Sequence, residues 1–167
     1  IEQVKQDFKA GVRRAIAAGF DVIELHFAHG YLVSSFLSPA TNKRTDKYGG
    51  SFENRTRLAL ELVEGAREIM PESMPLFVRI SSTDWLDNNL EYEGESWTVE
   101  QSAELAKLLA ARGVDVLDVS SGGNHRLQKI EVKDQDMGYH GALSKQIKKV
   151  VGDKLLVSTV GGITTGT

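Results

Sequence analysis

The sequence predicts an α/β fold built as a partial (β/α)8 TIM barrel of about four consecutive β/α units, and three observations lead to this prediction. Short runs rich in branched apolar residues are typical of strands, and amphipathic stretches typical of helices lie between them. The predicted strands start at positions 21, 76, 114 and 155, and this spacing suits strand–helix–strand units with parallel strands. No G-x-G-x-x-G motif follows the first strand, which argues against an open dinucleotide-binding sheet.

The first predicted element is a helix that is already under way at the first residue. Apolar side chains recur there every three or four residues, and Gly19 suits the left-handed position at which a helix ends. The four predicted strands cover residues 21–27, 76–82, 114–121 and 155–160. Because both ends of the chain read as interrupted elements, we expect residues 1–167 to form one partial barrel domain.

Three more helices are predicted between the strands. One starts near Ser51, which can cap it, and another follows Thr98, where Gln101 three positions later makes a capping-box pattern. The last is short and ends at Gly152.

Composition excludes several classes of function. The chain has 20 Lys and Arg against 23 Asp and Glu, a net charge of −3 without a clustered basic surface, so nucleic acid is not an expected partner. The absence of cysteine excludes disulfides, thiol nucleophiles and cysteine-bound metals within this chain. The longest stretch without charged residues, 25–42, contains histidines and hydroxyl side chains and is therefore not predicted to span a membrane. We expect a cytoplasmic protein without a membrane partner.

Chemistry-bearing residues gather after the first strand as His26-Phe-Ala-His29-Gly-Tyr31. The C-terminal ends of barrel strands form the reaction face, so these side chains are placed to meet a substrate. Histidines can donate hydrogen bonds to a developing oxyanion, and a tyrosine hydroxyl can act as a general acid. Arg79 lies inside an apolar strand and requires an anionic or carbonyl partner there.

Each of these residues has a plainer interpretation. A single histidine at a strand end is more often structural, although the three residues together favour a functional site. His26 and His29 could both bind a metal, but no third ligand stands at a suitable local spacing, so we expect no metal site. Arg79 has an alternative as the ion-pair partner of Glu24 or Asp118.

The motifs as a set resemble the old yellow enzyme family, the NADH:flavin oxidoreductases that act as FMN-dependent ene-reductases. The resemblance covers nearly the whole chain, and this chain has the His-x-x-His form of the motif, whereas other members carry Asn at the second position. The matching segments are His26 to Leu32, Phe36 to Pro39, Asn42 to Ser51, Glu53 to Arg55, Phe77 to Ser81, Ser120 to Gly123 and Val160 to Ile163.

The resemblance implies specific roles. His26 and His29 would hydrogen-bond the activating oxygen of the substrate, and Tyr31 would be the proton donor. Arg79 would contact the flavin, and Gly161 and Gly162 would bring backbone amides near its phosphate, with a plain turn as their alternative. The implied reaction passes a hydride from NADH or NADPH through FMN to the C=C bond of an α,β-unsaturated carbonyl compound.

The chain also departs from the family pattern. The first barrel strands and a phosphate-binding Gly-Arg pair of relatives have no counterpart here, and Tyr139-His140 stands where relatives often have Tyr-Gln. A non-catalytic fragment that acts only as a flavin-binding or assembly remnant is therefore the alternative function. An open sheet also favours self-association through its unpaired edges.

Overall fold

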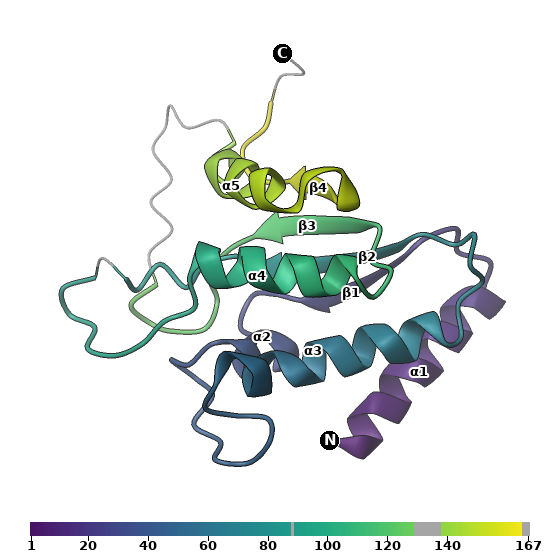
Figure 1. Ribbon diagram of the computed structural model, residues 1–167, viewed down its shortest axis with the longest axis horizontal. Coiled ribbons are helices and arrows are strands. Elements are labelled where there is room, and N and C mark those ends of the chain that lie inside the picture. The colour runs from purple at the N-terminus through teal and green to yellow at the C-terminus, as the bar shows by residue number, and fades with distance from the viewer. Residues whose placement is uncertain (88, 129–137, 165–167) are drawn as a thin grey trace.

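The computed structural model describes residues 1–87, 89–128 and 138–164, and in these ranges four parallel strands form one sheet in the order β1-β2-β3-β4 (Figure 1). The strands are β1 (Ile23–Phe27), β2 (Leu76–Ser81), β3 (Val116–Ser120) and β4 (Leu156–Thr159). Each strand lies beside the one that precedes it in the sequence, as in successive units of a β/α barrel. The predicted strands and their parallel order are confirmed, and the predicted strands extend past the observed ones by one or two residues.

Helices α3, α4 and α5 cover one side of this sheet (Figure 1). The helices are α1 (Glu2–Ala17), α2 (Leu32–Leu37), α3 (Phe52–Arg67), α4 (Val99–Ala110), α5 (Gly141–Val151) and the short 3-10 helix η1 (Gly152–Lys154). Ser51 and Thr98 cap α3 and α4 as predicted, accepting hydrogen bonds from the backbone amides of Asn54 at 3.2 Å and Gln101 at 3.4 Å. Within the described ranges, no helix is long and apolar enough to cross a membrane.

Helix α2 was not expected from the sequence. Its N-cap residue, Tyr31, makes no side-chain capping hydrogen bond, and the helix is too short to be stable by local propensity, but Val33 and Leu37 are buried in the core. Packing therefore holds this helix in place.

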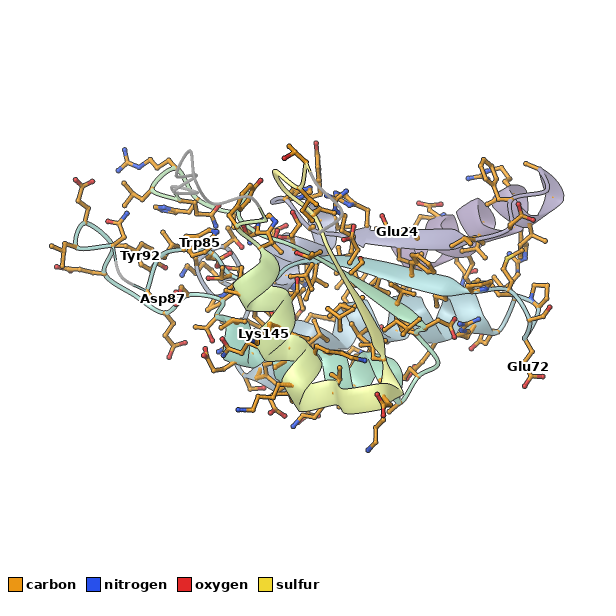
Figure 2. The ribbon with its side chains drawn as sticks, turned by 90° about the horizontal axis from the view of Figure 1, so that it is seen from above. Glu24, Glu72, Trp85, Asp87, Tyr92 and Lys145 are labelled. Carbon is orange, nitrogen blue, oxygen red and sulfur yellow. The ribbon has the colours of Figure 1, made fainter. Side chains whose placement is uncertain are left out.

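Side chains of β1 alternate between the two faces of the sheet. Ile23, Leu25 and Phe27 are buried in the core beneath the helices, whereas Glu24 and His26 are exposed. Figure 2 shows Glu24 on the side of the sheet opposite α5. We call this side the inner face, because it corresponds to the interior of a closed barrel.

Candidate active site

Three aromatic side chains meet where β1 ends. The ring centroids of His26 and His29 are 5.1 Å apart, and the ring of Tyr31 lies 5.5 Å from that of His26. Tyr31 is 65% exposed, so its hydroxyl is accessible. The structure thus brings the three residues of the H-x-x-H-x-Y motif together at the C-terminal edge of the sheet, where barrel enzymes bind substrates.

The backbone at His29 places this ring beside the ends of two neighbouring strands. The amide of His29 donates a 2.8 Å hydrogen bond to Ser81 Oγ, and Ser81 Oγ donates one of 2.7 Å to the carbonyl of Gly122. The ring Nε2 of His29 lies 2.7 Å from Ser120 Oγ. When Ser120 donates to Nε2, the imidazole proton resides on Nδ1, and Nδ1–H is then the donor left for a ligand.

Two glycines allow the loop after β1 to touch the loop after β3. A Cβ added to Gly30 would lie 1.9 Å from the carbonyl oxygen of Gly123, and one added to Gly123 would lie 2.2 Å from the carbonyl carbon of His29. Gly30 has a φ of 74° and Gly123 a φ of 103°. Only residues without a side chain fit this contact, which holds His29 beside β3.

Arg79 lies next to His26 across the sheet. The register pairs His26 with Arg79 and Arg79 with Asp118, and Arg79 Nε is 3.3 Å from Asp118 Oδ2. Asp118, rather than Glu24, is therefore the ion-pair partner. The Nε atom is buried without a hydrogen bond, and no described residue accepts a hydrogen bond from this guanidinium. Arg79 thus keeps unfilled donors on the inner face.

Electrostatics keep both histidines uncharged at neutral pH. Partial desolvation by the surrounding side chains lowers the pKa of His29, and also that of His26 despite its exposure, below the ordinary value of 6.5, and the charge of Arg79 lowers both pKa values further. Each neutral ring has one N–H donor and one acceptor nitrogen. On the same face, partial desolvation and then the negative charge of Asp118 raise the pKa of the Glu24 carboxyl, although this side chain is exposed.

The two predicted cofactor glycines lie at the end of β4, at the opposite edge of the sheet from β1. Gly161 has a φ of 103° and Gly162 a φ of 66°, and a Cβ added to Gly161 would lie 2.5 Å from the ring of Tyr139. His140 Nδ1 lies 2.9 Å from the carbonyl oxygen of Val160 and fixes the backbone just before the turn. Both glycines stand in a bend after β4, and Gly161 packs closely against Tyr139, just before α5.

Several residues that shape the site have no role that the sequence alone predicts. Ser81 and Ser120 orient His29, and the buried His140 joins the end of β4 to the loop after β3 through Ser121 Oγ, 2.6 Å from its Nε2. The sequence does indicate the place of two of them, because Ser81 and Ser120 are polar residues at the C-terminal ends of predicted strands.

The whole chain matches one family of flavoenzymes. The model of the NADH:flavin oxidoreductase / NADH oxidase family matches residues 1–167. The chain belongs to this family. Membership confirms the resemblance drawn from the sequence and indicates FMN as the family's cofactor, with NADH or NADPH as reductant.

Curated members of the NADH:flavin oxidoreductase / NADH oxidase family resemble the chain along nearly all of its length. An NADH:flavin oxidoreductase from Gibberella zeae is 54% identical over 99% of this chain and 41% of that protein. An NADPH dehydrogenase from Bacillus velezensis is 41% identical over 99% of this chain and 46% of that protein. The chain therefore spans less than half the length of these relatives.

Solved structures of the family share the fold of this chain. An old yellow enzyme homologue from Zymomonas mobilis matches with a TM-score of 0.69 and 25% identity, over 96% of this chain and 42% of that one. A 2-naphthoyl-CoA reductase matches with a TM-score of 0.77 and 30% identity, over 95% of this chain and 23% of that one. The four β/α units are thus part of a β/α barrel, and the predicted fold class is confirmed.

Proposed function

We propose that this chain supplies the substrate-activating residues and one flavin-binding wall of an FMN-dependent ene-reductase. This enzyme would use NADH or NADPH to reduce the C=C bond of α,β-unsaturated carbonyl compounds. The observation that carries the proposal is the meeting of the rings of His26 and His29 with the exposed Tyr31 at the end of β1. Relatives named NADPH dehydrogenase and old yellow enzyme homologue support it.

The inner face fits a flavin. Arg79 faces Asp118 with its buried Nε, and the rest of its guanidinium, in a side chain that is 29% exposed, can donate to the flavin ring system from the strand next to His26. Gly161 and Gly162 have positive φ and no side chains, so their amides can approach a phosphate. Bound FMN would supply the hydride chemistry, taking a hydride from NADH or NADPH and giving it to the substrate.

The chain's own residues would act on the substrate oxygen and on one carbon. His26 and His29 donate N–H groups to the carbonyl oxygen, where negative charge develops as the double bond is reduced, and losing one such donor typically costs about 2.7–4 kcal/mol. Tyr31 gives its phenolic proton to the α-carbon. Ser120 fixes the ring of His29, so this donor is preorganised.

The test is His26→Ala in the flavin-loaded holoenzyme, with two readouts. Phenol should bind the oxidised protein more weakly, as followed by the flavin absorbance, and reoxidation of the reduced flavin by cyclohex-2-enone should slow by about 10²–10³-fold. Flavin reduction by NADPH should stay unchanged and is the internal control. Unchanged phenol binding and enone reduction would contradict the proposal.

The same histidines could instead bind a metal, and the donor set argues against it. In the described part of the chain, no three His, Asp or Glu side chains are grouped to hold a metal ion. Activity should therefore survive chelators. Activity that is abolished by a chelator and restored by zinc would show that the histidines serve a metal.

Open sheet edges favour self-association of the isolated chain. Strands β1 and β4 are at the edges of the sheet, and Leu156 of β4 is 63% exposed. We propose that the isolated chain self-associates through these edges, which is the assembly alternative to catalysis. Apart from self-association, the proposed partner is a small molecule of the enone type, and neither nucleic acid nor a membrane is proposed as a partner. The proposed location is the cytoplasm.

A further inference from the structure

A fully buried carboxylate stands just beyond β2, outside the residues that would touch substrate or flavin. Asp84 has 0% of its surface exposed and accepts hydrogen bonds on both oxygens. Oδ1 receives Asn124 Nδ2 at 2.8 Å and Gln128 Nε2 at 3.1 Å, while Oδ2 receives the backbone amide of Trp97 at 3.1 Å and the hydroxyl of Ser38. A carboxylate buried without a cation is costly, and these four donors compensate it.

The four donors come from three separate segments. Ser38 follows α2, Trp97 precedes α4, and Asn124 and Gln128 belong to the loop after β3. Figure 2 shows Trp85 and Tyr92 in the long loop between β2 and α4, which extends beyond the sheet. This loop also touches the loop after β3 directly, since the ring of Tyr92 lies 5.3 Å from that of His125.

A chain of hydrogen bonds runs from this carboxylate to the turn that carries the candidate catalytic residues. Asn124 donates to Asp84, so its Oδ1 faces the other way and accepts from Ser34 Oγ at 3.1 Å. Ser34 Oγ in turn accepts from the amide of Gly30 at 3.3 Å. Gly30 stands between the histidine at 29 and the tyrosine at 31.

We propose that Asp84 is a positioning residue, which sets the place of His29 and Tyr31 through Asn124, Ser34 and Gly30. The inference rests on the proposed function, because it assigns the support of that same site. The direction of every hydrogen bond follows from the carboxylate, which only accepts. Asp84 thereby orients the amide of Asn124, and the amide oxygen holds the Ser34 hydroxyl.

Ser34→Ala interrupts the chain without touching the carboxylate. Its matched control is Ser102→Ala, because Ser102 is also a buried helical serine with two hydrogen bonds, from Trp97 Nε1 at 2.7 Å and to the carbonyl of Ser82 at 2.8 Å. Both changes should lower the melting temperature of the holoenzyme. Only Ser34→Ala should also weaken phenol binding, by roughly tenfold, and slow reoxidation by cyclohex-2-enone.

An exchange of amide and carboxylate tests the carboxylate itself. In Asp84→Asn, the remaining oxygen must face the backbone amide of Trp97, which cannot turn, so the new amide nitrogen meets the side-chain nitrogens of Asn124 and Gln128. Gln128 can turn, because its Oε1 is buried without a partner, but Asn124 can turn only by withdrawing its oxygen from Ser34. Asp84→Asn should therefore weaken phenol binding about as much as Ser34→Ala. Adding Asn124→Asp places a carboxylate at position 124, which can accept hydrogen bonds both from the new amide at position 84 and from the hydroxyl of Ser34. The double variant should therefore recover the affinity for phenol.

The outcomes separate this inference from the proposed function. Equal phenol affinity in Ser34→Ala and Ser102→Ala, while His26→Ala weakens it, would overturn the positioning role alone. An exchange variant no better than Asp84→Asn would also overturn it. Unchanged phenol binding in His26→Ala would instead reject the proposed function.

Discussion

Gly30→Ala is the substitution that most directly tests the close contact between the loops after β1 and β3. At a φ of 74°, an alanine is strained by about 1–2 kcal/mol. Its Cβ would also lie 1.9 Å from the carbonyl oxygen of Gly123, and backbone cannot swing away as a flexible side chain can. Overpacking of this kind costs about 1–3 kcal/mol, so the expected loss of unfolding free energy is about 2–5 kcal/mol.

Two other glycines separate the contributions to this loss. Gly50 has a φ of 82° but no atom within 4 Å of an added Cβ, so Gly50→Ala should show the strain alone, about 1–2 kcal/mol. Gly11 lies inside α1 and also has open space around an added Cβ. Gly11→Ala should therefore stabilise the protein, by about 0.5–1 kcal/mol.

The assay is urea denaturation of the three holoenzyme variants, with phenol binding measured on the same samples. Gly30→Ala should lose more stability than Gly50→Ala and should also bind phenol more weakly, because the loop that carries His29 and Tyr31 must move. If Gly30→Ala is no less stable than Gly50→Ala, the contact does not constrain the loop, and the reasoning is refuted.

Three further predictions concern protons and assembly. Tyr31→Phe should leave flavin reduction by NADPH unchanged and slow reoxidation by an enone by about 10²–10⁴-fold in stopped-flow experiments, and equal slowing of both half-reactions would contradict its role. Since burial lowers the pKa of His26, His29 and His140 below 6.5, the unfolded chain binds more protons than the folded chain below that pH. The contribution of these histidines to the free energy of unfolding should thus be at its maximum above about pH 6.5 and should decrease as the pH falls. Equal free energies of unfolding in urea titrations at pH 7.5 and 5.5 would contradict this prediction. The 167-residue chain alone should bind FMN weakly, lack enone turnover and associate in sedimentation experiments, whereas a monomer with micromolar FMN affinity and turnover would oppose this.

Periodicity predicted the sheet well because branched apolar runs and capping residues act locally. Thr98 caps α4 as expected. In a complete capping box, the side chain of Gln101 would accept a hydrogen bond from the backbone amide of Thr98, but its Oε1 instead accepts from Arg55 at 3.3 Å. Helix α2 escaped prediction for the opposite reason, because only its burial against distant residues stabilises it. Local sequence patterns therefore predict the strands with branched apolar runs and the helices with their own capping residues.

The candidate site was predictable in its residues and unpredictable in its supports. The histidines and tyrosine belong to one short motif, whereas Ser120 is 91 positions from His29 and meets it only in the folded sheet. The φ of His29, 61°, does explain one sequence feature of the resembled family. Asn and His enter this left-handed region more readily than most residues, and both occur at that position.

The register of the sheet has a consequence for how such proteins can change in length. His26, Arg79, Asp118 and Ser158 form one row across the inner face. Deleting a single residue within β2 would exchange its two faces, turning the guanidinium of Arg79 toward the helices and the side chain of Ile80 toward the inner face. Insertions and deletions beyond the strand ends leave this row intact, so changes in length are expected in the loops rather than in the strands.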